Sequence, residues 1–311
     1  MKSIGKIVLY LIFFTCLLFL FIDGPTAESA RSYLRGWDLG HILLFFIAGV
    51  LFLNDFRKYF KDKFITHLLI ILIFSLILGI LTELIQVRFH RSPDLGDLVR
   101  DLLGGALAIV FLSPRRYKIS RSLLRTLQFF LILLILVEIY PLSRALFDEW
   151  IAGKQFPVIS DFETLFEIDR WHHEHTVRLE KDVVRHGTQS LQVNLTISKY
   201  STASLRYFYP DWNNYSAFHF SLFNTGSDTL MMVCRINDRK HYSMGQTYQD
   251  RFNRRLFLPP GWSDFTIPMS EIQNAPKNRT MDLKHIDLIC FFSMDLPAGR
   301  TIYIDNLYLS R

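Results

Sequence analysis

The distribution of apolar and polar residues divides the chain into two unlike halves. Residues 1–150 consist mainly of long apolar runs, and five runs are candidate membrane helices, at 4–22, 38–53, 64–87, 97–113 and 122–147. A helix needs about 20 mostly apolar residues to cross the bilayer core. The second and fourth runs are shorter and carry polar residues near one end. The pattern predicts an α-helical transmembrane bundle of about five spans.

From Val158 onward the pattern changes to short alternating runs that are separated by Gly, Pro, Asn and Asp. The runs are "QSLQVNLTI", "ASLRYFYP", "YSAFHFSLFN", "LMMVCRIN", "RLFLPP", "SDFTIPM", "IDLICFFS" and "RTIYIDNLYLS". Such regular alternation is typical of an antiparallel β-sandwich or barrel. The chain is therefore predicted to be multidomain, with a helical membrane domain at 1–150, a linker at 151–157 and an all-β domain at 158–311.

The net charge of +6 is concentrated in three groups of Lys and Arg that lie before the first span, at 57–63 and at 115–125. All three groups fall on one side of the membrane if the five segments cross it. Cytoplasmic loops are enriched in Lys and Arg. We therefore expect a multi-pass protein of the cell membrane, with a cytoplasmic N-terminus and an extracytoplasmic C-terminal domain, and no nucleic-acid partner. We interpret the first segment as an uncleaved anchor, with a signal peptide ending near "PTAESA" as the alternative.

Polar residues interrupt the apolar half in the stretch "LTELIQVRFHRSPDLGDLVRDLLGG". Ionisable groups in a membrane are costly and usually face a bundle interior or a water-filled cavity. The i, i+3 and i, i+4 spacings place these groups on shared helix faces, and the topology brings three segments to one level at the outer membrane surface. The candidate cluster, catalytic or structural, is Asp38, His41, Glu83, Gln86, Arg91, Asp97 and Asp101.

The same residues carry a resemblance to a known family. The patterns "D..H...FF..G" at 38–49, "TE..Q" at 82–86, "RS" at 91–92 and "D...D..GG" at 97–105 resemble VanZ-like membrane proteins over about residues 35–113. The namesake of that family is linked to resistance against glycopeptide antibiotics. The resemblance implies a role in the cell envelope and supplies no reaction.

The second half resembles galactose-binding-like jelly rolls, which occur in carbohydrate-binding modules. The landmarks are "DFE" at 161–163, "HGTQSLQV" at 186–193, "DWNNYSAFHFSLFN" at 211–224, "LPPGWSDFTIPM" at 258–269 and "IYIDNLYL" at 302–309. The resemblance implies a two-sheet jelly roll and a glycan ligand, for which the candidate contacts are Tyr248, Arg251, Arg254 and Trp212. For Trp212, core packing is the alternative interpretation.

Two further features of the second half bear on metals and redox chemistry. Many such jelly rolls hold a structural Ca²⁺, and the resemblance places Glu163 and Asp305 at the matching positions. Cys234 and Cys290 lie in strand-like stretches, where either a disulfide or two buried thiols is compatible with the sequence.

Three functions are compatible with this organisation. The first is a non-enzymatic envelope protein whose jelly roll binds a surface polysaccharide while the helices anchor it in membrane lipid. The second is a membrane enzyme that acts on a lipid-linked glycan or its phosphate through the polar cluster. A transporter is disfavoured, because the charged residues lie at helix ends and no inverted repeat is visible.

Overall fold

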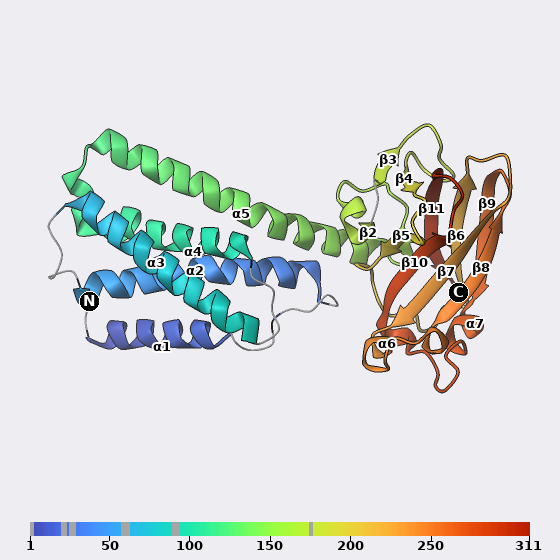
Figure 1. Cartoon of the computed structure of the whole chain (residues 1–311), viewed down its shortest axis with the longest axis horizontal. Coiled ribbons are helices and arrows are strands. Elements are labelled where there is room, and N and C mark those ends of the chain that lie inside the picture. Colours follow the sequence, from blue (N-terminus) through green and yellow to red (C-terminus); the bar gives the residue numbers. More distant parts are fainter. Residues whose placement is uncertain (1–2, 20–23, 25–28, 57–62, 89–93, 174–176) are drawn as a thin grey trace. The chain divides into compact units, whose positions relative to one another are not determined.

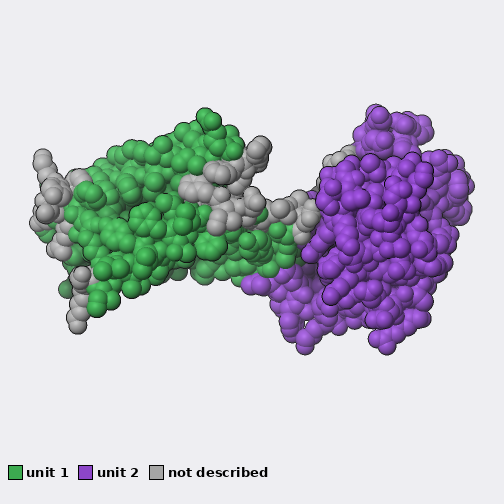
Figure 2. All heavy atoms as spheres, turned by 90° about the horizontal axis from the view of Figure 1, so that it is seen from below, with its two compact units in different colours: residues 1–144 green, residues 145–311 purple. Residues whose placement is uncertain are grey.

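The computed structural model describes residues 3–19, 24, 29–56, 63–88, 94–173 and 177–311. The chain forms two compact units, Met1–Arg144 and Ala145–Arg311, which are coloured separately in Figure 2. The first unit is helical and the second is built from β-strands, as the sequence predicts (Figure 1).

The helical unit contains α1 (Ser3–Phe19), α2 (Arg31–Phe56), α3 (Phe64–Arg88), α4 (Leu95–Leu107) and most of α5 (Arg121–Gln155). A π-helical turn (Ala108–Leu112) and a 3₁₀ turn (Pro114–Lys118) lead from α4 to α5. Among the described residues, α2, α3 and α5 are long and apolar enough to cross a membrane. The fourth predicted span is the short α4 with its π-helical turn, and α1 is also short, so the predicted number of five spans stays a prediction.

Small residues let α4 pack closely against both α2 and α3. A Cβ atom on Gly104 would lie 2.4 Å from the Ile42 carbonyl oxygen of α2, and one on Gly105 would lie 2.3 Å from the Ser75 hydroxyl of α3. Glycine is common at such helix interfaces in membranes, because it lets two backbones approach. The close approach brings the polar residues of the three helices together.

The second unit is an antiparallel sandwich of two sheets (Figure 1). In the first sheet the order is β3-β4-β11-β6-β9, with β1 paired to β11; in the second sheet it is β2-β5-β10-β7-β8. The strands are β1 (Val158–Ser160), β2 (Trp171–His173), β3 (Val177–Glu180), β4 (Ser190–Leu195), β5 (Tyr200–Leu205), β6 (Ala217–Asn224), β7 (Leu230–Asp238), β8 (Phe252–Leu258), β9 (Gly261–Pro268), β10 (Ile286–Met294) and β11 (Arg300–Ser310). Two short helices, α6 (Lys240–Ser243) and α7 (Met269–Gln273), and 3₁₀ turns at Glu167–Arg170, Tyr248–Asp250 and Leu283–His285 lie in the connections.

Alternation along the strands separates the two faces of the second sheet. On β7 and β10, Cys234, Ile236 and Phe291 belong to the core between the sheets. Val233 and Cys290 belong to a separate apolar cluster on the opposite face, which we call the outer face of the second sheet. The sandwich therefore has an apolar core between its sheets and a second apolar cluster on the outer face of the second sheet, which does not belong to that core.

All eight predicted runs overlap strands of the structure, whereas β1, β2 and β3 were not predicted. The run predicted at 203–210 is a strand at Tyr200–Leu205, because Ala203 and Leu205 point into the core and the chain turns after them. The predicted linker at 151–157 is largely helical, since α5 continues to Gln155. The antiparallel sandwich is confirmed, whereas the finer jelly-roll assignment stays a prediction.

Candidate functional site

A buried histidine forms the centre of the polar cluster in the helical unit. His41 Nδ1 on α2 lies 2.9 Å from Asp101 Oδ1 on α4, and His41 Nε2 lies 3.4 Å from Asp97 Oδ2. His41 and Asp101 are fully buried, and Asp97 nearly so. The i, i+4 spacing of the two aspartates places both on the α4 face that meets α2. The structure therefore brings together three residues that the sequence placed in one cluster.

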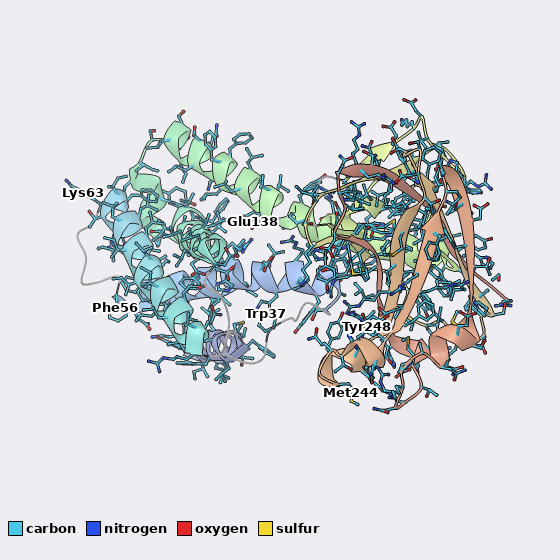
Figure 3. The ribbon with its side chains drawn as sticks, turned by 45° about the vertical axis from the view of Figure 1, so that its right-hand side comes forward. Trp37, Phe56, Lys63, Glu138, Met244 and Tyr248 are labelled. Carbon is cyan, nitrogen blue, oxygen red and sulfur yellow. The ribbon has the colours of Figure 1, made fainter. Side chains whose placement is uncertain are left out.

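The cluster continues through a guanidinium to a third helix. Arg100 Nη1 donates to Asp97 Oδ1 at 2.7 Å, and Arg100 Nε donates to Glu138 Oε2 on α5 at 2.9 Å. Figure 3 labels Glu138 on this helix. Arg100 and Glu138 were not among the predicted site residues. Glu138 could have been predicted from the sequence, because it is a carboxylate inside an otherwise apolar run, where a cationic partner is expected.

The remaining predicted residues occupy the edges of this cluster. Glu83 and Gln86 are both buried on α3, and Glu83 Oε2 accepts a hydrogen bond from the backbone N–H of Asp94 at 3.2 Å. Asp38 pairs with Arg35 at 3.4 Å and interacts electrostatically with Arg100. Arg91 lies outside the described residues. The side-chain network thus joins α2, α3, α4 and α5.

Packing fixes the position of the central carboxylate. A Cβ on Gly79 of α3 would lie 2.5 Å from Asp101 Oδ2, so the carboxylate lies directly against the α3 backbone. Within the described residues, Asp101 Oδ2 and Ser75 Oγ are buried without a hydrogen-bond partner. No group of three or more His, Cys, Asp or Glu residues in the described part of the chain is arranged to hold a metal ion. The arrangement supports ion pairing and proton sharing.

The second candidate site is a pocket of about 460 Å³ at one end of the sandwich. It lies between the turn that precedes β8 and the helix α7 that follows β9. Tyr248 is 66% exposed at its rim and is labelled in Figure 3. The Arg251 guanidinium lies 5.6 Å from the centre of the Tyr248 ring, an arrangement that holds both side chains. The lining residues are Tyr248, Gln249, Arg251, Phe252, Asn253, Glu271, Asn274, Ala275 and Lys277.

Two polar atoms of the pocket lining are buried without a partner among the described residues. One is the donor Arg251 Nε, and the other is the acceptor Asn253 Oδ1. The Asn253 amide nitrogen donates to the backbone carbonyls of Tyr248 and Arg251, which fixes the direction of its oxygen. A buried polar atom without a partner costs free energy. Both atoms belong to residues of the pocket lining, but almost none of their own surface is exposed.

A neighbouring ion-pair network holds the turn that carries Tyr248. Arg279 donates to both carboxylate oxygens of Asp238, at the end of β7, and of Asp250, in the turn before β8. The Arg279 guanidinium holds the pKa of Asp250 below its usual range. The buried His241 also belongs to this network, because its Nδ1 lies 3.1 Å from Asp250 Oδ2. These contacts tie the Tyr248–Asp250 turn to the sheet.

The other two predicted glycan contacts lie elsewhere. Trp212 is 0% exposed and packs against Phe208 and Phe218, so its assignment as a glycan contact is wrong and the alternative of core packing is correct. Arg254 donates to the Thr266 carbonyl at 3.3 Å and pairs with Glu271 at 3.5 Å. Arg254 does not line the pocket, but it orients Glu271, which does.

Glu163 and Asp305 serve as acceptors for one loop. Glu163 accepts hydrogen bonds from the backbone of Thr188 and Gln189 and from the Thr188 hydroxyl. Asp305 accepts from the backbone N–H groups of Arg185, His186 and Asn306. Calcium requires several oxygen ligands. Both carboxylates instead accept hydrogen bonds from N–H groups and, at Glu163, from the Thr188 hydroxyl, so the calcium ion stays a prediction.

The two cysteines of the sandwich are free thiols on opposite faces of the second sheet. Cys234 faces the core and Cys290 faces outward. Burial raises the pKa of both thiols. Of the two alternatives, the structure therefore has buried thiols.

Comparison with known proteins gives matches of fold at low sequence identity. No family model matches the chain, and no curated protein matches it either. The VanZ-like resemblance of residues 35–113 therefore stays a prediction.

Solved structures that resemble the chain include a carbohydrate-binding module, an agarase and a part of a xylanase. The family 11 carbohydrate-binding module from Clostridium thermocellum, in complex with a β-1,3-1,4-mixed-linked tetrasaccharide, is 16% identical, covering 49% of this chain and 94% of that one with a TM-score of 0.36. An exo-β-agarase is 13% identical over 49% of this chain and 24% of its own, with a TM-score of 0.39. The N-terminal CBM22-1-GH10 modules of Clostridium thermocellum xylanase 10B, complexed with xylohexaose, are 13% identical over 50% of this chain and 28% of their own, with a TM-score of 0.35. With TM-scores below 0.5, these are likenesses that do not decide what the chain binds.

Proposed function

We propose that the chain is a non-enzymatic, integral membrane protein of the cell envelope whose sandwich binds an envelope glycan. Its helices anchor the sandwich in membrane lipid, with the N-terminus cytoplasmic and the sandwich extracytoplasmic. The three apolar helices α2, α3 and α5 support membrane insertion. The basic groups at 57–63 and 115–125 support this orientation.

The observation that carries the proposal is the exposed Tyr248 ring at the rim of a pocket whose lining includes the polar side chains of Gln249 and Asn253. A sugar hydroxyl both donates and accepts hydrogen bonds, so amide side chains such as these can bind it in either role. The exposed Tyr248 ring beside them offers a flat apolar surface for the CH groups of a pyranose. Concave sites with a few polar groups of fixed direction are typical of small-ligand recognition.

The test uses the full chain in lipid nanodiscs and a panel of envelope polysaccharides on a glycan array. We expect at least one glycan to bind, and we expect Tyr248→Ala and Asn253→Ala to weaken that binding by about tenfold or more, the equivalent of roughly 1.4 kcal/mol. Tyr209→Ala is the matched control, because Tyr209 is an exposed tyrosine that does not line the pocket. If no glycan binds, or if Tyr248→Ala and Asn253→Ala bind the glycan as tightly as the wild type and the Tyr209→Ala control do, the proposal is wrong.

A membrane enzyme acting on a lipid-linked glycan or its phosphate is a second candidate function, which the buried His41–Asp101 pair favours. An imidazole between two carboxylates can hold or transfer a proton. The same geometry serves a structural network, since buried charges need partners. A His41→Gln variant that folds normally but loses an envelope phenotype would favour the enzyme over the structural role.

A further inference from the structure

Three arginines gather on the outer face of the second sheet, next to the Tyr248 pocket. Arg235 on β7 is in register with Cys290 on β10, and it is also in register with Asn253 on β8. Arg206 directly follows β5, and Arg251 directly precedes β8. Strand register and strand ends therefore place the three arginines near Cys290. Burial raises the pKa of the Cys290 thiol, and the guanidinium groups of Arg235, Arg251 and Arg206 oppose that rise.

None of the three arginines forms an ion pair with a carboxylate of the described residues. Arg235 Nε donates to the Asn237 amide oxygen at 3.1 Å, and Arg206 Nη1 donates to the Tyr242 hydroxyl at 3.3 Å. Arg251 Nε is buried without a partner in the described part of the chain. The Asp287 carboxylate interacts electrostatically with Arg206, but it accepts from Tyr242 at 2.9 Å and pairs with Arg239 at 3.6 Å.

Elsewhere in the described part of the sandwich, the buried and half-buried arginines have carboxylate partners, whereas the exposed Arg255 and Arg311 form no ion pair with a described carboxylate. Arg170 pairs with Asp148, Arg185 with Asp264, Arg279 with Asp238 and Asp250, and Arg300 with Asp228. The arginine group on the outer face is therefore an exception among the arginines of this domain that are partly removed from water, and it needs a separate explanation.

The exception is energetically unfavourable in the absence of an anion. Burial lowers the pKa of Arg235, and the nearby Arg251 and Arg206 lower it further. Burial likewise lowers the pKa of Arg251. Like charges that are partly removed from water repel each other. An anion bound between them relieves this repulsion, and the planar guanidinium fork matches a carboxylate or phosphate.

We propose that Arg206, Arg235 and Arg251 form an anion subsite that recognises the carboxylate or phosphate groups of an acidic glycan. This inference rests on the proposed glycan binding, because Arg251 belongs both to the pocket and to the arginine group. A sugar in the Tyr248 pocket and an acidic group on the outer face then belong to one continuous ligand. Tyr242 and Asn237 hold two of the arginines by hydrogen bonds from neutral side chains.

The experiment measures binding to the full chain in nanodiscs of neutral lipid, by titration calorimetry at low and high salt. The probes are oligogalacturonate, a neutral galactan of matched length, a glycerol-phosphate polymer and inorganic phosphate. We expect at least one acidic polymer to bind about tenfold or more tightly than the neutral galactan at low salt. We expect that preference to shrink at high salt, because ions screen charges near the surface. The polymer that binds distinguishes a carboxylate ligand from a phosphate ligand.

The variants Arg206→Gln and Arg235→Gln are expected to weaken binding of the acidic polymer about tenfold each and to change binding of the neutral galactan less than twofold. Arg178→Gln is the matched control on the other sheet, where Arg178 pairs with Glu180. Arg235→Lys keeps the charge without the fork and is expected to bind with intermediate affinity. Unchanged thermal unfolding confirms that each variant is folded.

The outcomes separate this inference from the proposed function. Equal binding of acidic and neutral polymers, unaffected by Arg206→Gln and Arg235→Gln, overturns the anion subsite and leaves glycan binding intact. Binding of inorganic phosphate that depends on Arg206 and Arg235, without binding of any polymer, supports the anion subsite and contradicts the glycan proposal. Failure of every anionic probe to bind overturns the inference.

Discussion

At the scale of single residues, Asp305 is the clearest case of a buried carboxylate with a stability consequence. It is fully buried on β11 and accepts three backbone hydrogen bonds. Burial raises the pKa of Asp305 to about 6. An aspartate in an unfolded chain has a pKa of about 3.9. The folded state therefore binds more protons between about pH 4 and pH 6, so the contribution of Asp305 to stability decreases as the pH rises through that window.

Between about pH 4 and pH 6, the free energy of unfolding of the wild type is expected to fall by about 1–3 kcal/mol because of Asp305, and we expect Asp305→Asn to remove this fall. The variant is also expected to be less stable than the wild type at neutral pH by about 1–3 kcal/mol, because an amide offers one acceptor oxygen in place of two. Unfolding in urea, followed by tryptophan fluorescence from pH 4 to pH 7, measures both effects. The control is Asp182→Asn, at an exposed position. Parallel pH profiles of wild type and Asp305→Asn contradict the expectation.

The polar residues that the sequence predicted together share one property. Asp97 and Asp101 are spaced i, i+4 on α4, and Asp38 and His41 are spaced i, i+3 on α2, so the period of a helix places each pair on one face whatever its neighbours are. The pairing of Arg100 with Glu138 depends on how α5 is rotated against α4, which no local pattern contains. Trp212 was ambiguous for a related reason, because an aromatic residue near a strand end is equally compatible with the core and with a ligand contact.

At the scale of elements, the contact between α2 and α4 depends on Gly104. A Cβ atom added at Gly104 would lie only 2.4 Å from the Ile42 carbonyl oxygen and 2.8 Å from the Phe46 backbone nitrogen. Because both atoms belong to the α2 backbone, neither can move aside as a flexible side chain would. Alanine at this position must separate the helices that hold His41 and Asp101.

We expect Gly104→Ala to lower the stability of the helical unit by about 1–3 kcal/mol, the usual cost of overpacking. Gly40→Ala is the matched control on α2, because a Cβ there meets no atom within 4 Å. Alanine is favoured over glycine inside a helix by about 1 kcal/mol, so the control is expected to be neutral or stabilising. Thermal unfolding of the full chain in detergent compares the two, and equal effects would exclude close packing as the reason for Gly104.

The end of α5 shows why the predicted boundary near residue 150 differs from the structural one. Asp148 on α5 and Arg170 are both buried, and the guanidinium donates to both Asp148 oxygens at 2.9–3.1 Å. From the sequence, the change from apolar to mixed polarity after Tyr140 resembles the end of a span. Polarity cannot reveal that a polar helix end packs into the following domain, because the partner is 22 residues away.

We expect a fragment of residues 145–311 to fold alone and a fragment of residues 156–311 to fold poorly. Loss of one partner from a buried ion pair costs about 3–5 kcal/mol, a large part of the stability of a domain of this size. Soluble yield and the dispersion of a two-dimensional NMR spectrum measure folding. Asp148→Asn in the longer fragment tests the ion pair itself, and equal folding of the two fragments would contradict the role assigned to Asp148.

At the scale of the whole molecule, the prediction with the widest consequence is the orientation in the membrane. Glycan binding outside the cell requires the sandwich to be extracytoplasmic, and the basic loop at 115–125 must then be cytoplasmic. The two assignments depend on each other, because the single helix α5 (Arg121–Gln155) joins the basic loop to the sandwich. One crossing of α5 therefore decides both.

Cysteine substitutions that are labelled in intact cells show on which side of the membrane the sandwich and the basic loop lie. We expect Lys181→Cys, at an exposed position of the sandwich, to react with a membrane-impermeant maleimide, and Lys118→Cys, exposed before α5, to react only after the cells are lysed. The wild type sets the background, which we expect to be low because Cys234 and Cys290 are buried. The reverse pattern would place the sandwich in the cytoplasm and would exclude envelope glycans as its ligand. Labelling of both variants in intact cells would show that α5 does not cross the membrane.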